Sequence, residues 1–179
     1  MARQGIETAK FGRWLTEYLK DFRYQVYYDH GDKRKYSNVF SIKGFYGVEV
    51  HNINRLTDID VLIASKNNEI KILIEIEERK ISPKKLLGDI LAILMCNRIA
   101  IRKGKKQEYF TVNDKTKLIV AGILPNNGNR IRKICDVIKP RLDSFSGYSD
   151  GICPKNIHLI FEEDISSSIN KLRDFIIKI

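Results

Sequence analysis

The chain has 179 residues, of which 43% are hydrophobic and 30% charged, values typical of one soluble globular domain with an apolar core. Its apolar runs are too short to cross a bilayer and its first residues lack the apolar segment of a secretion signal, so we expect a cytoplasmic protein with no membrane partner. The formal net charge of +10 favours an anionic partner, and three widely spaced cysteines argue against a disulfide framework.

The first half of the chain predicts one helix followed by strands. Apolar residues recur at helical spacing over residues 5–21, and residues 24–29 have a strand pattern. Residues 31–38 predict a basic turn, and residues 39–50 predict one or two short strands. Two further strands, 58–64 and 70–77, are joined by a short Lys-Asn-Asn turn.

The second half alternates helices and strands. Ser82 as a cap and Pro83 at the first helical position predict a helix that ends near residue 96. Residues 102–116 are polar and predict a loop, whereas the apolar run 118–124 predicts a strand buried on both faces. A helix over 129–144, a strand over 157–161 and a final helix capped by Asp164 complete an α/β pattern. We therefore expect a three-layer α/β/α fold with a central mixed β-sheet.

Acidic residues gather on the two strands in the middle of the chain. Side chains alternate along a strand, so Asp58 and Asp60 share one face of the first strand, and Glu75 and Glu77 share one face of the second. The short turn makes these strands neighbours. If the isoleucine-rich faces point into the core, all four carboxylates meet on the other face.

Four adjacent carboxylates repel one another and raise each other's pKa, so a compensating cation is expected. Carboxylate oxygens are ligands for Mg²⁺, and a metal-bound water of lowered pKa can attack a phosphodiester. The alternative is a solvated strand face on which Lys66 and Lys71 screen the acids.

An Asp followed by aliphatic residues, a turn and an aliphatic strand that ends in Glu-Ile-Glu resembles the core of the PD-(D/E)XK nuclease superfamily. The resemblance covers roughly residues 7–96, with 75 − 60 = 15 residues between the two motif acids. It implies a restriction-endonuclease-like fold and metal-dependent hydrolysis of DNA with Mg²⁺ or Mn²⁺. By position it makes Asp60 and Glu75 metal ligands, adds the carbonyl of Ile76, and leaves Asp58 as the second choice to Asp60.

The chain has Glu77 where the superfamily pattern has Lys, a departure also seen in a restriction endonuclease with Glu-x-Glu. Glu77 is then a candidate general base, or a metal ligand through water. Lys84 or Lys85 is a candidate replacement for the missing ammonium, with a plain phosphate contact as the alternative. The resemblance also implies a Glu on the first helix that faces the metal. Glu7 fits best and Glu17 second, although both also suit a solvated helix face.

Basic residues are concentrated between Lys80 and Arg141, where 15 basic and 4 acidic residues give a net charge of +11. Clustered cations release counterions from nucleic-acid phosphates, whereas a lysine-rich solvated surface is the alternative. The candidate phosphate contacts are Lys33, Arg34, Lys35, Lys84, Lys85, Arg102, Lys103, Lys105, Lys106 and Arg130.

These features together predict a Mg²⁺- or Mn²⁺-dependent DNA endonuclease. We expect a homodimer, since one site per chain cuts one strand and symmetry supplies the second. A restriction-type enzyme and a structure-specific enzyme similar to Holliday-junction resolvases both fit, and phosphate contacts alone do not distinguish DNA from RNA. The rival from another class is a non-catalytic DNA-binding module on a nuclease fold, for which the missing Lys is the best support.

Overall fold

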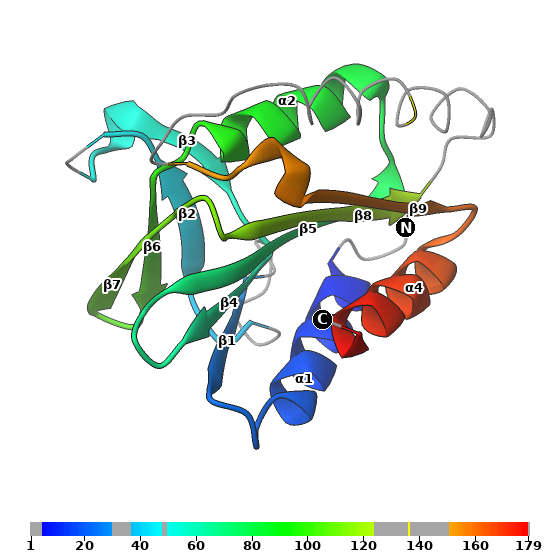
Figure 1. Ribbon diagram of the computed structural model, residues 1–179, viewed down its shortest axis with the longest axis horizontal. Helices are drawn as coiled ribbons and strands as arrows, with labels where there is room; N and C mark the ends of the chain where they lie inside the picture. The colour runs from blue at the N-terminus through cyan, green and yellow to red at the C-terminus, as the bar shows by residue number, and fades with distance from the viewer. Residues whose placement is uncertain (1–4, 30–36, 48–49, 124–135, 137–150, 179) are drawn as a thin grey trace.

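The computed structural model describes residues 5–29, 37–47, 50–123, 136 and 151–178 (Figure 1). The helices with described bounds are α1 (Ile6–Tyr18), α2 (Pro83–Leu94) and α4 (Ile165–Ile177). The strands are β1 (Tyr24–Tyr28), β2 (Ser41–Phe45), β3 (Arg55–Asp58), β4 (Val61–Ser65), β5 (Ile70–Lys80), β6 (Arg98–Lys103), β7 (Lys106–Thr111), β8 (Lys117–Ile123) and β9 (Ile157–Glu162). None of the described helices is long and apolar enough to cross a membrane.

A five-stranded mixed sheet lies at the centre, in the order β1-β4-β5-β8-β9. Neighbours in the first three strands are antiparallel, whereas β8 runs parallel to β5 and β9 parallel to β8. Figure 1 shows α2 on one side of this sheet and α1 with α4 on the other. The predicted α/β fold with a mixed sheet is therefore confirmed.

Both faces of the central strands are buried. The face of Val61 and Ile74 packs with α1 and α4, whereas the face of Leu62 and Leu73 packs with α2. Strands that are covered on both sides contain near-continuous hydrophobic runs, and β8 is such a strand, as its sequence predicted.

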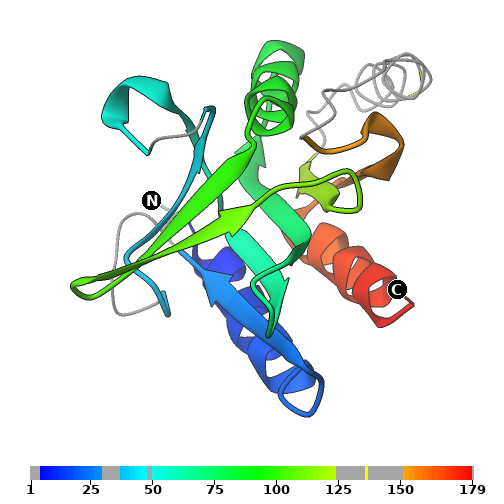
Figure 2. The same cartoon turned by 60° about the vertical axis from the view of Figure 1, so that its left-hand side comes forward.

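A second sheet, in the order β3-β2-β6-β7, packs on the α2 side of the first (Figure 2). It corrects the prediction of a polar loop over residues 102–116, most of which belong to the β6–β7 hairpin. The hairpin is mostly polar on its outer face, and its inner face carries large buried apolar residues such as Ile101 and Phe110. Gly104 provides the turn with its positive φ of 64°.

Local capping signals place the helices as expected. The Ser82 hydroxyl accepts the backbone N–H of Lys85 at 3.2 Å, and the Asp164 carboxylate accepts that of Ser167 at 2.9 Å. The first helix ends three residues earlier than predicted, at Tyr18. The helix predicted over 129–144 and most of the basic turn at 31–38 lie outside the described residues.

Candidate active site

Asp60, which directly precedes β4, and Glu75, on the neighbouring strand β5, lie side by side in the central sheet. The register pairs Val61 with Ile74, so the next position along the two strands places Asp60 opposite Glu75. The Asp60 carboxylate accepts the backbone N–H of Ile76 at 2.7 Å. This hydrogen bond fixes one oxygen of Asp60 against β5, and the predicted adjacency of the two acids is confirmed.

Glu77 and α2 complete the acidic cluster on the same face of β5. The Glu77 carboxylate forms an ion pair with the Lys85 ammonium, which also contacts Asp89 at 3.1 Å. Gly122 lies opposite Glu77 on β8, and a Cβ there would lie 2.9 Å from the Glu77 Cβ. The absence of a side chain at Gly122 therefore leaves room for Glu77.

Asp60 is buried and has other acids as neighbours, and both conditions disfavour its charged form. Burial raises its pKa to about 7, and the neighbouring charges of Glu77, Glu78 and Asp29 act in the same direction. The hydrogen bond from Ile76 opposes this shift because it stabilises the charged form. Asp60 is therefore poised between its neutral and charged forms near neutral pH.

The carboxylate of Glu75 has fewer stabilising contacts than that of Asp60. Burial is the main reason why the pKa of Glu75 lies well above its ordinary value, and repulsion from Asp60, Asp89 and Glu77 raises this pKa further. The Lys85 charge acts in the opposite direction. The Oε2 atom of Glu75 is buried and has no hydrogen-bond partner in the described part of the chain. A buried carboxylate oxygen without a partner is costly, so this oxygen suits a cation or a proton.

Three acids near the site escaped the sequence analysis: Asp29, Glu78 and Asp89. Asp89 is detectable in principle, because it lies four residues after Lys85 on the same face of α2. Glu78 has the parity of Ile76 and points to the opposite side of the sheet. There its carboxylate accepts the backbone N–H groups of Gly5 and Thr8, each at 2.7 Å, and the Thr8 hydroxyl at 2.8 Å.

Glu78→Gln is expected to lower the free energy of unfolding by about 1–3 kcal/mol, because an amide cannot accept this whole set of donors. Urea denaturation measures the effect. Glu17→Gln is the control, since Glu17 is exposed and pairs with Lys20 on the helix surface, and it should change stability by less than about 0.5 kcal/mol. Equal effects of the two substitutions would show that Glu78 does not hold α1 against β5.

Asp58 does not join the cluster, and the prediction of one strand over 58–64 is wrong. The chain leaves the second sheet at Asp58 and enters the central sheet at Val61, with the buried Ile59 bonded to the Ile42 carbonyl between them. Asp58 forms an ion pair with Arg55, and its side chain is 58% exposed. A change of sheet thus breaks the alternation that would have put Asp58 and Asp60 on one face.

The remaining candidates occupy distinct places. Glu7 lies in the first turn of α1, where its carboxylate pairs with Lys10 at 2.7 Å. Lys84 is exposed on α2, and its neighbour Lys85 is the lysine that reaches Glu77. Ile76 contributes its backbone N–H to Asp60, and the metal contact expected of its carbonyl stays a prediction.

Within the described ranges, no set of three or more His, Cys, Asp or Glu side chains is arranged to hold a metal ion. Lys85 holds Glu77, Lys10 holds Glu7, and Arg55 holds Asp58. Among the candidate acids, Asp60 and Glu75 are therefore the two for which the described part of the chain shows no ion pair with Lys or Arg, so they are the better candidate metal ligands.

The basic candidates divide into described and undescribed groups. The hairpin residues Arg102, Lys103, Lys105 and Lys106 are all exposed. Lys84 and Lys85, on α2, are exposed as well, whereas Lys33, Arg34, Lys35 and Arg130 lie outside the described residues. The hairpin and the start of α2 are thus the parts of the predicted phosphate-binding surface that the structure describes.

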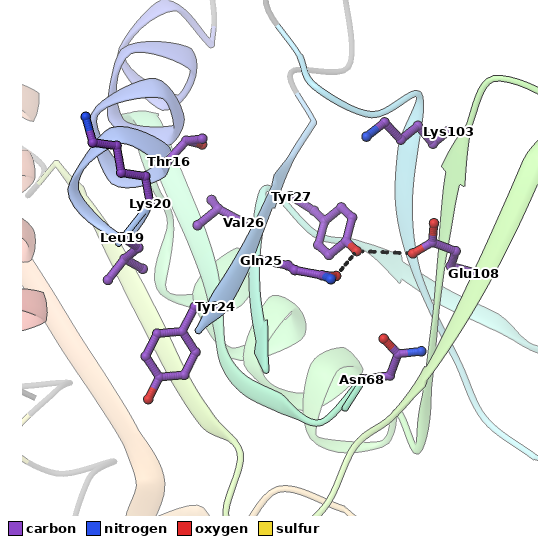
Figure 3. A pocket seen from close by; sticks show the side chains of 10 residues that line it. All are labelled: Thr16, Leu19, Lys20, Tyr24, Gln25, Val26, Tyr27, Asn68, Lys103 and Glu108. Carbon is purple, nitrogen blue, oxygen red and sulfur yellow. Dashed lines mark hydrogen bonds between the residues drawn. The ribbon is translucent and has the colours of Figure 1, made fainter. Parts of the chain in front are cut away.

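A cavity of about 460 Å³ lies apart from the acids, between the end of α1, β1 and the β6–β7 hairpin (Figure 3). The Tyr27 hydroxyl lies between Gln25 Oε1 at 2.5 Å and Glu108 Oε2 at 3.1 Å. Burial, reinforced by Glu108, raises the pKa of Tyr27 to about 12. This cavity is lined by neither Asp60 nor Glu75, so it is distinct from the candidate active site.

Comparison of the chain with protein-family models, curated proteins and solved structures gave no match.

Proposed function

We propose that the protein is a Mg²⁺- or Mn²⁺-dependent DNA endonuclease with a restriction-endonuclease-like fold similar to that of the PD-(D/E)XK superfamily. Three features support this proposal. The central sheet is mixed and has helices on both sides. Asp60 directly precedes one strand, Glu75 lies on the adjacent strand at the position of the second motif acid, and Glu77 follows it where the superfamily pattern has Lys.

The observation that carries the proposal is the buried Glu75 oxygen that has no partner in the described part of the chain, beside Asp60. Both residues supply the hard oxygen donors that Mg²⁺ prefers. Mg²⁺ is commonly held by only one or two carboxylates together with waters and substrate phosphates. The pair therefore fits the ion although no larger ligand set is assembled among the described residues.

In this mechanism Asp60 and Glu75 would hold the metal ion. The ion, when bound, would lower the pKa of a water molecule and offset charge on the leaving oxygen. Asp60 keeps its orientation because the Ile76 N–H holds Oδ2, which leaves Oδ1 for the ligand role.

Glu77 and Lys85 supply the proton transfer and the positive charge in this proposal. Lys85 is bound to Oε1 of Glu77, so the second carboxylate oxygen, Oε2, is the atom that accepts the proton of the attacking water. The Lys85 ammonium takes the place of the Lys missing from the strand motif. It also lowers the pKa of Glu75, which keeps that ligand closer to its charged form.

The substrate class follows from charge. The exposed basic hairpin favours phosphate contacts, and the concentration of Lys and Arg between residues 80 and 141 supports a nucleic-acid partner. A homodimer would bring two sites to the two strands of a duplex. A restriction-type enzyme and an enzyme similar to Holliday-junction resolvases are both consistent with these features.

The test is a cleavage assay on supercoiled plasmid, linear duplex and four-way-junction DNA, with Mg²⁺, with Mn²⁺ and with EDTA. We expect metal-dependent cleavage by the wild-type chain that falls at least about 10³-fold in Glu75→Ala, because a metal ligand is lost. DNA binding in EDTA should persist in that variant, and the exposed-residue control Asp21→Ala should cleave normally. DNA binding without cleavage of any substrate would favour the non-catalytic DNA-binding module.

A further inference from the structure

The outer face of the second sheet contains a hollow of about 230 Å³. Ile42, Ile99 and Ile101 point from this sheet into the core, so the residues between them point outward. Two cross-strand rows line it: Ser41, Arg102 and Gln107 form one, and Lys43 and Ala100 form the other, which Tyr109 continues on the next strand. The small Ala100 side chain stands between two long ones, which creates the depression.

The lining of this hollow combines the apolar residues Phe45, Val50 and Ala100 with polar side chains that suit an anion. Its polar side chains are Ser41, Lys43, His51, Asn52, Arg102 and Gln107. Each of them can donate a hydrogen bond, two carry a permanent positive charge, and none is a carboxylate. Arg102 uses only Nε in its contact with the Gly104 carbonyl, at 3.4 Å. On β3, Asp58 lies opposite Lys43, and its charge is offset by Arg55.

The cavity in Figure 3 differs from this hollow in the chemistry of its walls. Glu108 places a carboxylate there, next to the Tyr27 hydroxyl, and Lys103 lies at its edge. A carboxylate repels a phosphate, so the hollow on the outer face, whose polar side chains are all hydrogen-bond donors, is the better phosphate site.

The hollow is connected to the candidate active site by one short stretch of chain. Lys43 lies opposite Asp58, and Asp60 follows two residues later. With about 5.5 Å between the Cα atoms of a residue pair and about 3.3 Å per residue, the Cα atoms of Lys43 and Asp60 lie within about 12 Å of each other. A DNA segment held at the hollow would therefore lie beside the stretch of chain that leads to Asp60.

We propose that this hollow binds a backbone phosphate of duplex DNA, which makes the outer face of the second sheet the DNA-docking surface. The proposal rests on the proposed function for its partner and adds Lys43, Asn52 and Gln107 to the residues that hold it. The volume accommodates a phosphate with part of its sugar. Tyr109, whose side chain is 52% exposed, flanks the hollow and offers an apolar surface to that sugar.

The first test measures DNA affinity without metal, so that binding is separated from cleavage. The full-length chain is titrated into a fluorescent mixed-sequence duplex of about 20 base pairs in EDTA, at several salt concentrations. For Lys43→Ala/Arg102→Ala we expect at least about tenfold weaker binding and a salt slope shallower by about 2, or about 0.9 per lost phosphate contact. Lys10→Ala/Lys178→Ala removes the same charge from the other side of the central sheet, on α1 and at the end of α4, and should leave the slope nearly unchanged.

The second test adds one negative charge without changing shape. Gln107→Glu should weaken binding about three- to tenfold, because a carboxylate would face the phosphate. Gln25→Glu is the isosteric control, since Gln25 lines the Figure 3 cavity instead. Melting curves check that each variant is folded.

The outcomes separate this inference from the proposed function. If the wild-type chain binds DNA and the hollow variants match their controls, the docking surface is wrong while the endonuclease proposal stands. If the hollow variants lose binding but the wild-type chain never cleaves, the docking surface stands and hydrolysis fails. If the wild-type chain binds only RNA, anionic phospholipid vesicles or nothing, both proposals are overturned.

Discussion

Asp60→Asn is expected to raise the melting temperature of the metal-free protein at pH 8 and, in the same molecule, to abolish metal-dependent cleavage. The carboxyl group of Asp60 is buried among other acids, which raises its pKa to about 7. Ionisation of Asp60 therefore costs folding free energy at pH 8. Asn removes the charge and can still accept the Ile76 N–H.

The direction of the pH dependence follows from the difference between the pKa of Asp60 in the folded and in the unfolded chain. The ordinary Asp pKa of 3.8 applies to the unfolded chain and a value of about 7 to the folded one. Below about pH 4 both states bind the proton and the two proteins should be equally stable. Between about pH 4 and 7 the unfolded state loses its proton first, so wild-type stability falls as the pH rises, and above about 7 the full penalty applies.

The difference at pH 8 should reach about 2–4 kcal/mol, or about 5–10 °C in melting temperature for a chain of this size. Calorimetry in EDTA at pH 4, 6 and 8 measures it. Glu75→Gln should act in the same direction, and the double variant should gain less than the sum because the two acids repel each other. Asp21→Asn is the exposed control, with an expected change below about 0.5 kcal/mol.

Mg²⁺ at millimolar concentration should reverse the order of stability. It should stabilise the wild-type chain, whose two carboxylates are charged ligands, but leave Asp60→Asn unchanged. Two results together would rule out the buried acidic pair as a metal-binding element. The first is a difference in stability between the wild type and Asp60→Asn that is the same at pH 4, 6 and 8, and the second is a wild-type stability that Mg²⁺ does not change.

Gly12→Ala is expected to destabilise the protein although alanine is the better helix former. Gly12 is buried in α1, and a Cβ at this position would lie 2.4 Å from Cγ of the Tyr28 ring on β1. The helix therefore contacts the sheet through its backbone at this point. Overpacking costs about 1–3 kcal/mol or more, which outweighs the helix propensity gain of about 1 kcal/mol.

Gly88→Ala is the matched control for that substitution. Gly88 also lies inside a helix, but a Cβ there meets nothing within 4 Å. The same chemical change should then raise the free energy of unfolding by about 0.5–1 kcal/mol, through propensity alone. Urea denaturation of both variants checks the prediction, and effects of the same sign would contradict the close contact between α1 and Tyr28.

Local sequence patterns determined much of this protein. Alternation along residues 70–77 placed Glu75 and Glu77 on one face of β5, because side-chain direction on a strand depends only on position. Ser82 and Asp164 located two helix starts, since a cap is satisfied within its own turn. The short turn made the two strands neighbours, as predicted, whereas the register that places Asp60 opposite Glu75 includes an irregularity between Ile63 and Ala64.

Tertiary structure decided the features that depend on distant parts of the chain. Asp58 left the cluster because the chain changes sheets at Ile59, and no local signal marks that change. Lys85 instead of Lys84 reached Glu77 because successive helical residues point about 100° apart, and the packing of α2 selects which one faces β5.

The second sheet shows the same limit most clearly. Its β6–β7 hairpin has a polar outer face, so its composition indicated a loop, and only its packing against the shared core made it a sheet. Glu78 likewise found its partners at Gly5 and Thr8, more than 65 positions away along the chain. The sequence alone thus determined which residues share a strand face or a helix turn. Burial and contact between distant segments decided which charges meet.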